Sequence, residues 1–168
     1  MALSICIKIG DKNPIAGEFA GVGPAKNSKP HAGEIQVLSW NWGLTQSASA
    51  HSGTGASTGV ADVKDLTFTK YVDKATPNLL YYCFAGTAFD KAILTVTKVS
   101  GDDKPLEFFV LTLSGTVFIS SVHTGDPLPN DMYSETVTLN FNKAHIQYTP
   151  QKADHTADSP VSQDIIIT

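Results

Sequence analysis

The sequence predicts a mainly β protein in which two sheets form a closed or nearly closed barrel and one short α-helix lies beside them. Most segments alternate apolar and polar residues, as half-buried strands do. The apolar phase shifts between Phe141 and Ala144, which indicates a bulge or corner of the kind found in barrels and orthogonal sandwiches. Only residues 76–86 carry a helical pattern.

Two strands are expected in the first 44 residues. Residues 3–9 alternate and place four aliphatic side chains on one face, whereas residues 10–32 are rich in Gly, Pro, Lys and Asn and are expected to form a connection. Residues 33–44 follow as the second strand. Trp40 and Trp42 project from the same side of it, because side chains two positions apart on a strand share a face. This strand therefore belongs to a sheet with one dry face and one wet face.

A long loop and a third strand come next. Residues 45–60 are almost all small and cannot anchor a core, so we expect a long flexible loop. Residues 61–71 are expected to form a strand. Leu66 and Phe68 share one face of this strand, and threonines occupy the other.

The helix is expected to begin at Thr76 as N-cap, with Pro77 at the first helical position, where its missing N–H costs nothing. Four apolar residues follow at helical spacing, namely Leu79, Leu80, Cys83 and Phe84. Gly86 can adopt the left-handed conformation that ends a helix. Two to three turns result, which need packing against a sheet to be stable.

The remaining elements are mostly strands. In order they are a strand at 91–99, a hairpin turn at 101–104, one long or two bent strands over 106–122 with a bend at Ser114 and Gly115, a loop at 123–133, a strand at 134–148 and a short strand near 165–167. We expect a single domain over residues 1–150 and a C-terminal tail over residues 151–168.

The composition argues against nucleic-acid binding and membrane insertion. The net charge is −4 at pH 7, every basic residue is a lysine, and no basic run occurs. Arginine is the usual residue for phosphates and base edges, and it is absent. The first nine residues are short, alternating and without a basic start, so we expect a strand rather than a signal peptide. No stretch approaches the roughly 20 apolar residues of a membrane helix.

We expect no catalytic, cofactor-binding or metal-binding residues, and therefore no enzyme. The five histidines are scattered without the spacing of metal ligands, so surface positions are expected for them. The glycines from 53 to 59 lack the Lys-Ser/Thr ending of a phosphate loop. Asp62 and Asp65 are expected on opposite faces of a strand, where they cannot flank one bond. Cys6 and Cys83 are expected to be free thiols in a reducing cytosol.

Small uncharged polar residues are expected to share one face of several strands. They are Ser39, Asn41, Thr67, Thr69, Thr95, Thr97, Thr136, Thr138 and Asn140. Threonine suits any exposed strand face, which is one explanation. The other is that this face lines a water-filled passage built from several copies of the chain. The sequence leaves both open.

Several segments resemble the signature of the Hcp family, the tube proteins of bacterial type VI secretion systems. The similar segments are residues 33–43, 63–80, 120–122, 135–141 and 148–154. The resemblance covers essentially the whole chain, and the run from Lys70 to Leu80 is long and specific.

The resemblance implies a β-barrel with one flanking helix, similar to phage tail-tube proteins, and homohexameric rings that stack into a tube. The implied partners are other copies of the chain, a contractile sheath, a VgrG spike and effector proteins carried in the lumen, with no cofactor. The chain is then made in the cytoplasm without a signal peptide and exported by the secretion machine.

Two sets of residues follow from the resemblance. The expected lumen-facing residues are Ser39, Asn41, Thr136, Thr138 and Asn140, and the expected ring-stacking residues in the loop are Ser47, Ser49, His51, Ser52 and Thr54. The position between the two tryptophans faces the lumen in close relatives, and Asn41 occupies it here. The alternative function is a monomeric β-sandwich module that binds carbohydrate.

Overall fold

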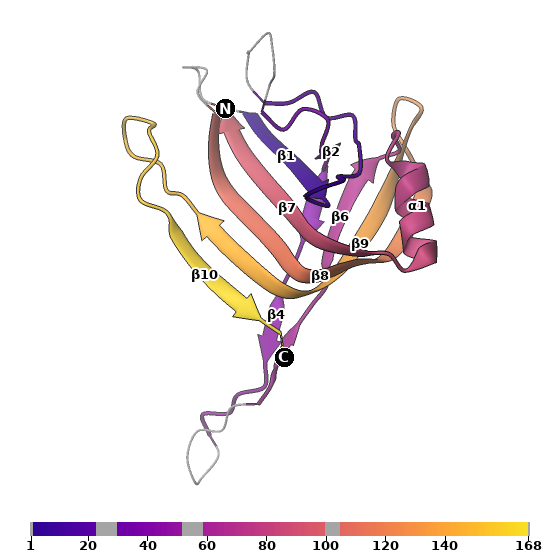
Figure 1. The fold of residues 1–168 in the computed structure, drawn as a ribbon. Coiled ribbons are helices and arrows are strands. Elements are labelled where there is room, and N and C mark those ends of the chain that lie inside the picture. The colour runs from indigo at the N-terminus through magenta and orange to yellow at the C-terminus, as the bar shows by residue number, and fades with distance from the viewer. Residues whose placement is uncertain (1, 23–29, 52–58, 100–104, 168) are drawn as a thin grey trace.

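The computed structural model describes residues 2–22, 30–51, 59–99 and 105–167 (Figure 1). The elements in chain order are β1 (Ala2–Ile9), β2 (Ile35–Gln36), β3 (Ser39–Asn41), β4 (Leu44–Gln46), β5 (Ala61–Val63), β6 (Leu66–Tyr71), α1 (Thr76–Ala85), β7 (Ala88–Val99), β8 (Pro105–Leu128), β9 (Met132–Tyr148) and β10 (Val161–Ile166). The expected turn at 101–104 lies outside the described residues.

Eight strands form one strongly curved sheet, a half-barrel (Figure 1). The strand order is β2-β1-β7-β8-β9-β6-β3, and β10 also pairs with β9. Strands β4 and β5 form a separate two-stranded sheet. The mainly β class is confirmed, with α1 as the one helix of the described residues. The closed two-sheet barrel stays a prediction.

The expected continuous strand over residues 33–44 is wrong, because this segment changes partners along its length. Strand β2 pairs with β1, whereas β3 pairs with β6 at the other end of the sheet. Between them, the Val37 N–H donates to Ile5 O at 2.9 Å and the Leu38 N–H donates to Thr69 O at 2.8 Å. Residues 35–41 therefore contact both β1 and β6, which lie second from the two ends of the strand order.

The core lies on the face of the sheet that carries the tryptophans, as predicted. Trp40 stacks on Phe109 with ring centroids 5.2 Å apart, and Trp42 meets Phe141 edge-on at 5.8 Å. Both tryptophans are half-buried against the main apolar cluster. Its fully buried members include Ile7, Leu66, Phe68, Leu94, Leu111 and Leu139. Each such side chain stabilises the fold by about 1.5–3 kcal/mol relative to exposure.

Strands β8 and β9 form a long hairpin that replaces the loop expected at 123–133. Pairing continues from Thr124 with Glu135 to Leu128 with Met132. Gly125 has φ 99° at a register shift, so the glycine that suggested a loop instead forms a bulge within the ladder.

The expected bend at Ser114 and Gly115 is confirmed. The β8–β9 register shifts between Ser114 and Val117, opposite Lys143 and Phe141. This bulge also accounts for the predicted phase shift of the apolar residues in β9, because two exposed residues separate the buried Phe141 from the buried Ala144.

The helix is confirmed, but Thr76 is not its N-cap. Ala75 occupies that position, without a side-chain cap hydrogen bond, and Thr76 is the first helical residue. The Thr76 hydroxyl instead accepts a hydrogen bond from the Asp73 N–H at 3.1 Å and donates one to the Glu135 carboxylate at 2.8 Å. Gly86 ends the helix with φ 64°, as predicted.

Thr95 and Thr97 do not lie on an exposed polar face. Both are 1 % exposed and therefore buried. Phe19 and Val22 of the connection expected at residues 10–32 pack with Cys6 in a second small apolar cluster. Part of the expected connection therefore packs on the sheet.

Among the described residues, no helix combines the length and the apolar character that crossing a bilayer requires.

Candidate functional site

A polar face extends across four adjacent strands. The register places its side chains in two rows, Ser39–Thr69–Thr136–His123 and Asn41–Thr67–Thr138–Ser121, each running from β3 through β6 and β9 to β8. The rows present hydroxyls, one amide and one imidazole, and contain no Lys, Asp or Glu. This polar face can therefore form hydrogen bonds with a passing chain without attracting or repelling it strongly by charge.

Hydroxyl pairs hold the polar face together across the strands. Ser39 Oγ and Thr69 Oγ1 are 2.6 Å apart, and Thr67 Oγ1 and Thr138 Oγ1 are 3.3 Å apart. Cross-strand pairs of this kind stabilise a sheet by roughly 0.2–1 kcal/mol. Ser39 and Asn41 are exposed, whereas Thr136 and Thr138 are half-buried.

The Asp65 carboxylate lies at the end of the polar face, next to Asn140. The Asn140 amide donates to Asp65 at 2.9 Å, and the Ser120 hydroxyl lies 3.3 Å from the same carboxylate. The expected lumen-facing residues thus come from β3 and β9. They lie on one continuous surface because β6 connects the two strands.

The expected loop over residues 45–60 begins and ends in a short hairpin that projects from the main sheet (Figure 1). Strands β4 and β5 pair Leu44 with Val63 and Gln46 with Ala61. Three expected stacking residues, Ser47, Ser49 and His51, are exposed beyond this hairpin. The other two, Ser52 and Thr54, lie outside the described residues.

A buried ion pair, which the sequence analysis missed, fixes the start of α1 to the sheet. Lys70 and Glu135 are register partners on β6 and β9, are both fully buried and are joined by an ion pair. The ammonium also donates to Tyr71 O at 2.7 Å and to the Asp73 carboxylate at 2.9 Å, so all three of its N–H groups are used. Both residues fall in the apolar phase of their strands, and that position is the signal that could have revealed them.

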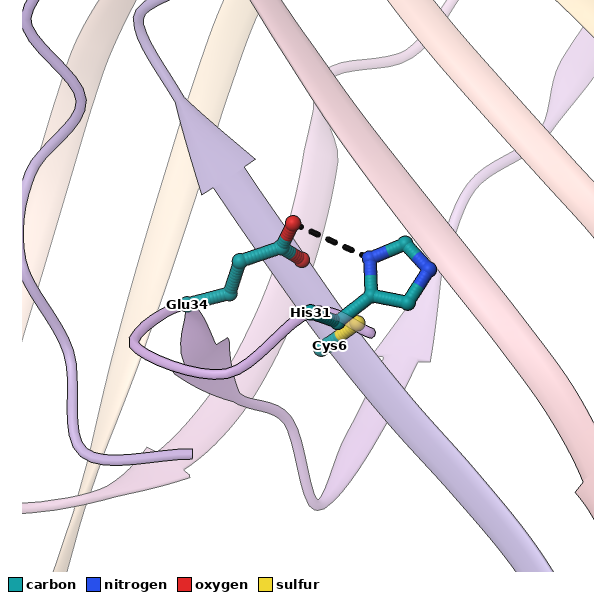
Figure 2. A group of neighbouring side chains, drawn as sticks. All are labelled: Cys6, His31 and Glu34. Carbon is teal, nitrogen blue, oxygen red and sulfur yellow. Dashed lines mark hydrogen bonds and ion pairs between the residues drawn. The ribbon is translucent and has the colours of Figure 1, made fainter. Parts of the chain in front are cut away.

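The sequence did not reveal a second cluster of polar side chains, which contains a thiol, an imidazole and a carboxylate. Cys6 of β1 meets His31 and Glu34 of the connection before β2, and Figure 2 shows the three side chains converging. His31 Nδ1 is 3.0 Å from Glu34 Oε1, and its Nε2 is 2.6 Å from Glu107 Oε1. The expectation that all histidines are scattered on the surface is wrong for His31, whose side chain is 18 % exposed.

The electrostatics of this cluster follow from its contacts. Burial raises the pKa of the Cys6 thiol to about 11. Contacts with the Cys6 sulfur and with the Glu107 and Glu34 carboxylates raise the pKa of His31 to about 12, and the pairing with His31 lowers the pKa of Glu107. Each ring nitrogen of His31 faces a carboxylate oxygen, and this geometry favours the imidazolium form. Cys6 is distant in sequence from His31 and Glu34, which are three positions apart, and the β1–β2 pairing brings it close to them.

Comparison with known proteins identifies the family. Residues 7–148 match the family model described as Type VI secretion system effector, Hcp. The chain belongs to the Hcp family.

Hcp relatives resemble this chain along nearly its whole length. It is 44 % identical to the Hcp1 protein of Pseudomonas aeruginosa over 158 residues, which cover 94 % of this chain and 90 % of the relative. The structure of Hcp1 from Salmonella typhimurium has 28 % identity and a TM-score of 0.72, covering 99 % of this chain and 96 % of that one. A structure described as a type six secretion system protein reaches a TM-score of 0.81 at 26 % identity, covering 98 % and 96 %.

The Hcp match includes all four strands of the polar face. It begins one residue after Cys6 and ends with β9, so β10 and the Cys6 thiol lie outside the matched residues of this Hcp chain.

Proposed function

We propose that this Hcp chain is a structural subunit of the type VI secretion tube. In this proposal it forms homohexameric rings, the rings stack into a tube, and the tube carries effector proteins in its lumen. The observation that carries the proposal is the uncharged polar face that runs unbroken across β3, β6, β9 and β8. The Hcp family membership supports the same assignment.

The chemistry of the polar face suits a conduit. Fixed charges along a passage would hold oppositely charged cargo and exclude cargo of the same sign. Hydroxyl and amide groups exchange hydrogen bonds with water and cargo at similar free energy. We therefore assign Ser39, Asn41, Thr136, Thr138 and Asn140 to the lumen.

Ring formation follows from a contact between two different surfaces of the chain. Such a head-to-tail contact gives a closed ring when the rotation between subunits closes, and it covers strand edges that would otherwise remain open. In this proposal residues 1–150 form the domain that closes into a barrel. Residues 151–168 are attached to this domain through β10.

The hairpin of β4 and β5 is the proposed contact between stacked rings, through Ser47, Ser49, His51, Ser52 and Thr54. Deleting residues 46–58 should therefore abolish tubes and leave rings intact, because the ring contacts lie elsewhere. Electron microscopy of the deletion variant decides this, with a variant that carries a Gly/Ser stretch of equal length as control. Tubes of normal length in the deletion variant would contradict the stacking role.

The remaining assignments belong to the same proposal. The contractile sheath surrounds the tube, the VgrG spike caps it, and the secretion machine exports the chain from the bacterial cytoplasm. The chain has a structural role without catalysis. The carbohydrate-binding alternative needs an exposed aromatic platform, whereas Trp40 and Trp42 pack on Phe109 and Phe141.

The solution mass of the purified chain tests the ring. A hexamer has six times the chain mass of 17.9 kDa, and negative-stain images should contain rings with an open centre. A chain that stays monomeric at high concentration would overturn the proposal.

A further inference from the structure

We propose that Cys6, His31 and Glu34 form a binding site for a divalent transition-metal ion, with Zn²⁺ as the best match. This site is separate from the tube function, because its residues lie on β1 and the connection before β2, whereas the polar face is formed by β3, β6, β9 and β8.

The donor atoms have a suitable arrangement. The Cys6 sulfur, one ring nitrogen of His31 and one carboxylate oxygen of Glu34 all lie within 4.8 Å of one another. Ligand atoms around tetrahedral zinc are roughly 3.5 Å apart, as follows from metal–ligand distances of about 2.0–2.3 Å. Side-chain rotations that move each donor by about 1 Å therefore suffice to close the site around an ion.

The set of donor types favours zinc. Thiolate, imidazole and carboxylate are its three protein ligands, and a site with three of them keeps a fourth position for water. Magnesium and calcium prefer oxygen ligands alone. When the ion binds, the thiol proton and the Nδ1 proton leave to solvent, and the metal takes their places.

A further carboxylate, that of Glu107, holds the His31 ring in its orientation. His31 Nε2 donates to Glu107 Oε1 at 2.6 Å, which turns Nδ1 toward Cys6 and Glu34. A histidine that binds a metal through one nitrogen commonly donates from the other to a carboxylate in this way. We therefore assign Glu107 as the residue that positions His31.

One buried polar atom in the cluster needs a partner. Glu34 Oε2 makes no hydrogen bond within the described part of the chain. A buried carboxylate oxygen without a partner is costly, and a metal ion would relieve that cost.

The connection holds these donors in place and leaves a route for an ion. The Gly33 N–H donates to Phe19 O at 2.8 Å, and the Phe19 N–H donates to Glu34 O at 3.0 Å. A surface pocket of about 350 Å³ borders His31 and Glu34. Lys8 also lines this pocket, but its ammonium lies 3.6 Å from the Asp11 carboxylate, which offsets its charge.

The test uses the reduced, full-length protein after removal of metals with a chelator. Titration with Co²⁺ should give a thiolate-to-cobalt charge-transfer band that saturates at about one ion per chain and disappears when Zn²⁺ is added. Zinc should also raise the melting temperature, because it binds the folded state. The absence of the band at saturating cobalt would overturn the proposal.

Variants identify the ligands. Cys6→Ala should abolish the charge-transfer band, whereas Cys83→Ser, which removes the other free thiol, should leave it unchanged. His31→Gln and Glu34→Gln should each weaken cobalt binding at least about tenfold, and Glu107→Gln should weaken it about 10- to 100-fold through the orientation of His31.

The Gln variants keep the test decisive if Cys6→Ala does not fold, because they change partly exposed residues with little change of shape. Cobalt affinity that is unchanged in both His31→Gln and Glu34→Gln would overturn the proposal. Loss of the band in Cys83→Ser would overturn it as well.

Discussion

At the scale of single residues, the buried ion pair of Lys70 and Glu135 holds neighbouring elements of the fold together. Both are fully buried, and the network they form with Asp73 and Thr76 joins β6, β9 and the start of α1. Removing one member of such a pair is strongly destabilising, because the remaining charge stays buried without its partner. Replacing both members with apolar residues of similar volume is often nearly neutral.

We expect Lys70→Met to lower the free energy of unfolding by about 3–5 kcal/mol. The double variant Lys70→Met/Glu135→Leu should recover most of that loss. Urea unfolding at one fixed protein concentration measures both, since stability depends on concentration if the proposed ring forms. If the free energy of unfolding of Lys70→Met lay within about 0.5 kcal/mol of the parent value, the network would contribute nothing to stability.

The proposal that the polar face lines the lumen makes its most specific prediction for Asn41. It is exposed between the two tryptophans and faces away from the core. Asn41→Lys should leave the ring mass unchanged and should weaken the retention of a basic effector at least about tenfold, which corresponds to 1.4 kcal/mol. Like charges placed together at an interface cost several kcal/mol, so this estimate is a lower bound.

Co-purification of the effector with rings measures the effect. Asn78→Lys is the matched control, because it places the same charge on the exposed surface of α1. Equal effector retention by the two variants would argue against a lumenal position for Asn41.

At the scale of elements, bulges give the long strands their curvature. Gly115 has φ 81° at the β8 bulge, and a Cβ atom there would collide with the side chain of Asn142. That asparagine accepts a hydrogen bond from the Thr116 N–H at 2.9 Å and so holds the bulge. A side chain at position 115 would therefore strain the backbone and displace this support.

Gly115→Ala should lower the free energy of unfolding by about 1–3 kcal/mol, the cost of one strained backbone position. Gly43→Ala is the control, because Gly43 has no positive φ and no atom within 4 Å of an added Cβ. Urea unfolding compares the two variants. Equal stability would mean that the bulge tolerates a side chain.

At the scale of the whole molecule, β10 attaches the C-terminal residues to the body. It pairs with β9 over six positions, and His145 Nδ1 lies 2.6 Å from the Asp164 carboxylate across this ladder. Ile165 packs on the main core, whereas Ile166 is 65 % exposed. The two neighbouring isoleucines therefore lie on opposite sides of the strand.

Ile165→Ser should lower the free energy of unfolding by about 1–2 kcal/mol, because the Ile165 side chain is partly buried against the main core. Ile166→Ser should change it by less than about 0.5 kcal/mol, as exposed positions do. Thermal or urea unfolding of the two variants distinguishes a docked C-terminal strand from a loose tail. Similar losses in both variants would contradict docking.

The sequence by itself determined the features that depend on neighbouring residues. Alternation marked β1, β6, β7 and β9, the Gly86 signal ended the helix, and the spacing of Trp40 and Trp42 placed both indoles toward the core. These features follow from local geometry, because strand and helix periodicities fix which side chains share a face.

Only the tertiary structure decided the features that depend on contacts between distant segments. Residues 35–41 change partner from β1 to β6, Phe19 and Val22 pack with Cys6, and β1–β2 pairing brings Cys6 to His31 and Glu34. Lys70 and Glu135 form an ion pair although they are 65 positions apart in the sequence. Such contacts depend on which strands lie side by side, and the alternation within one strand carries no information about its partner.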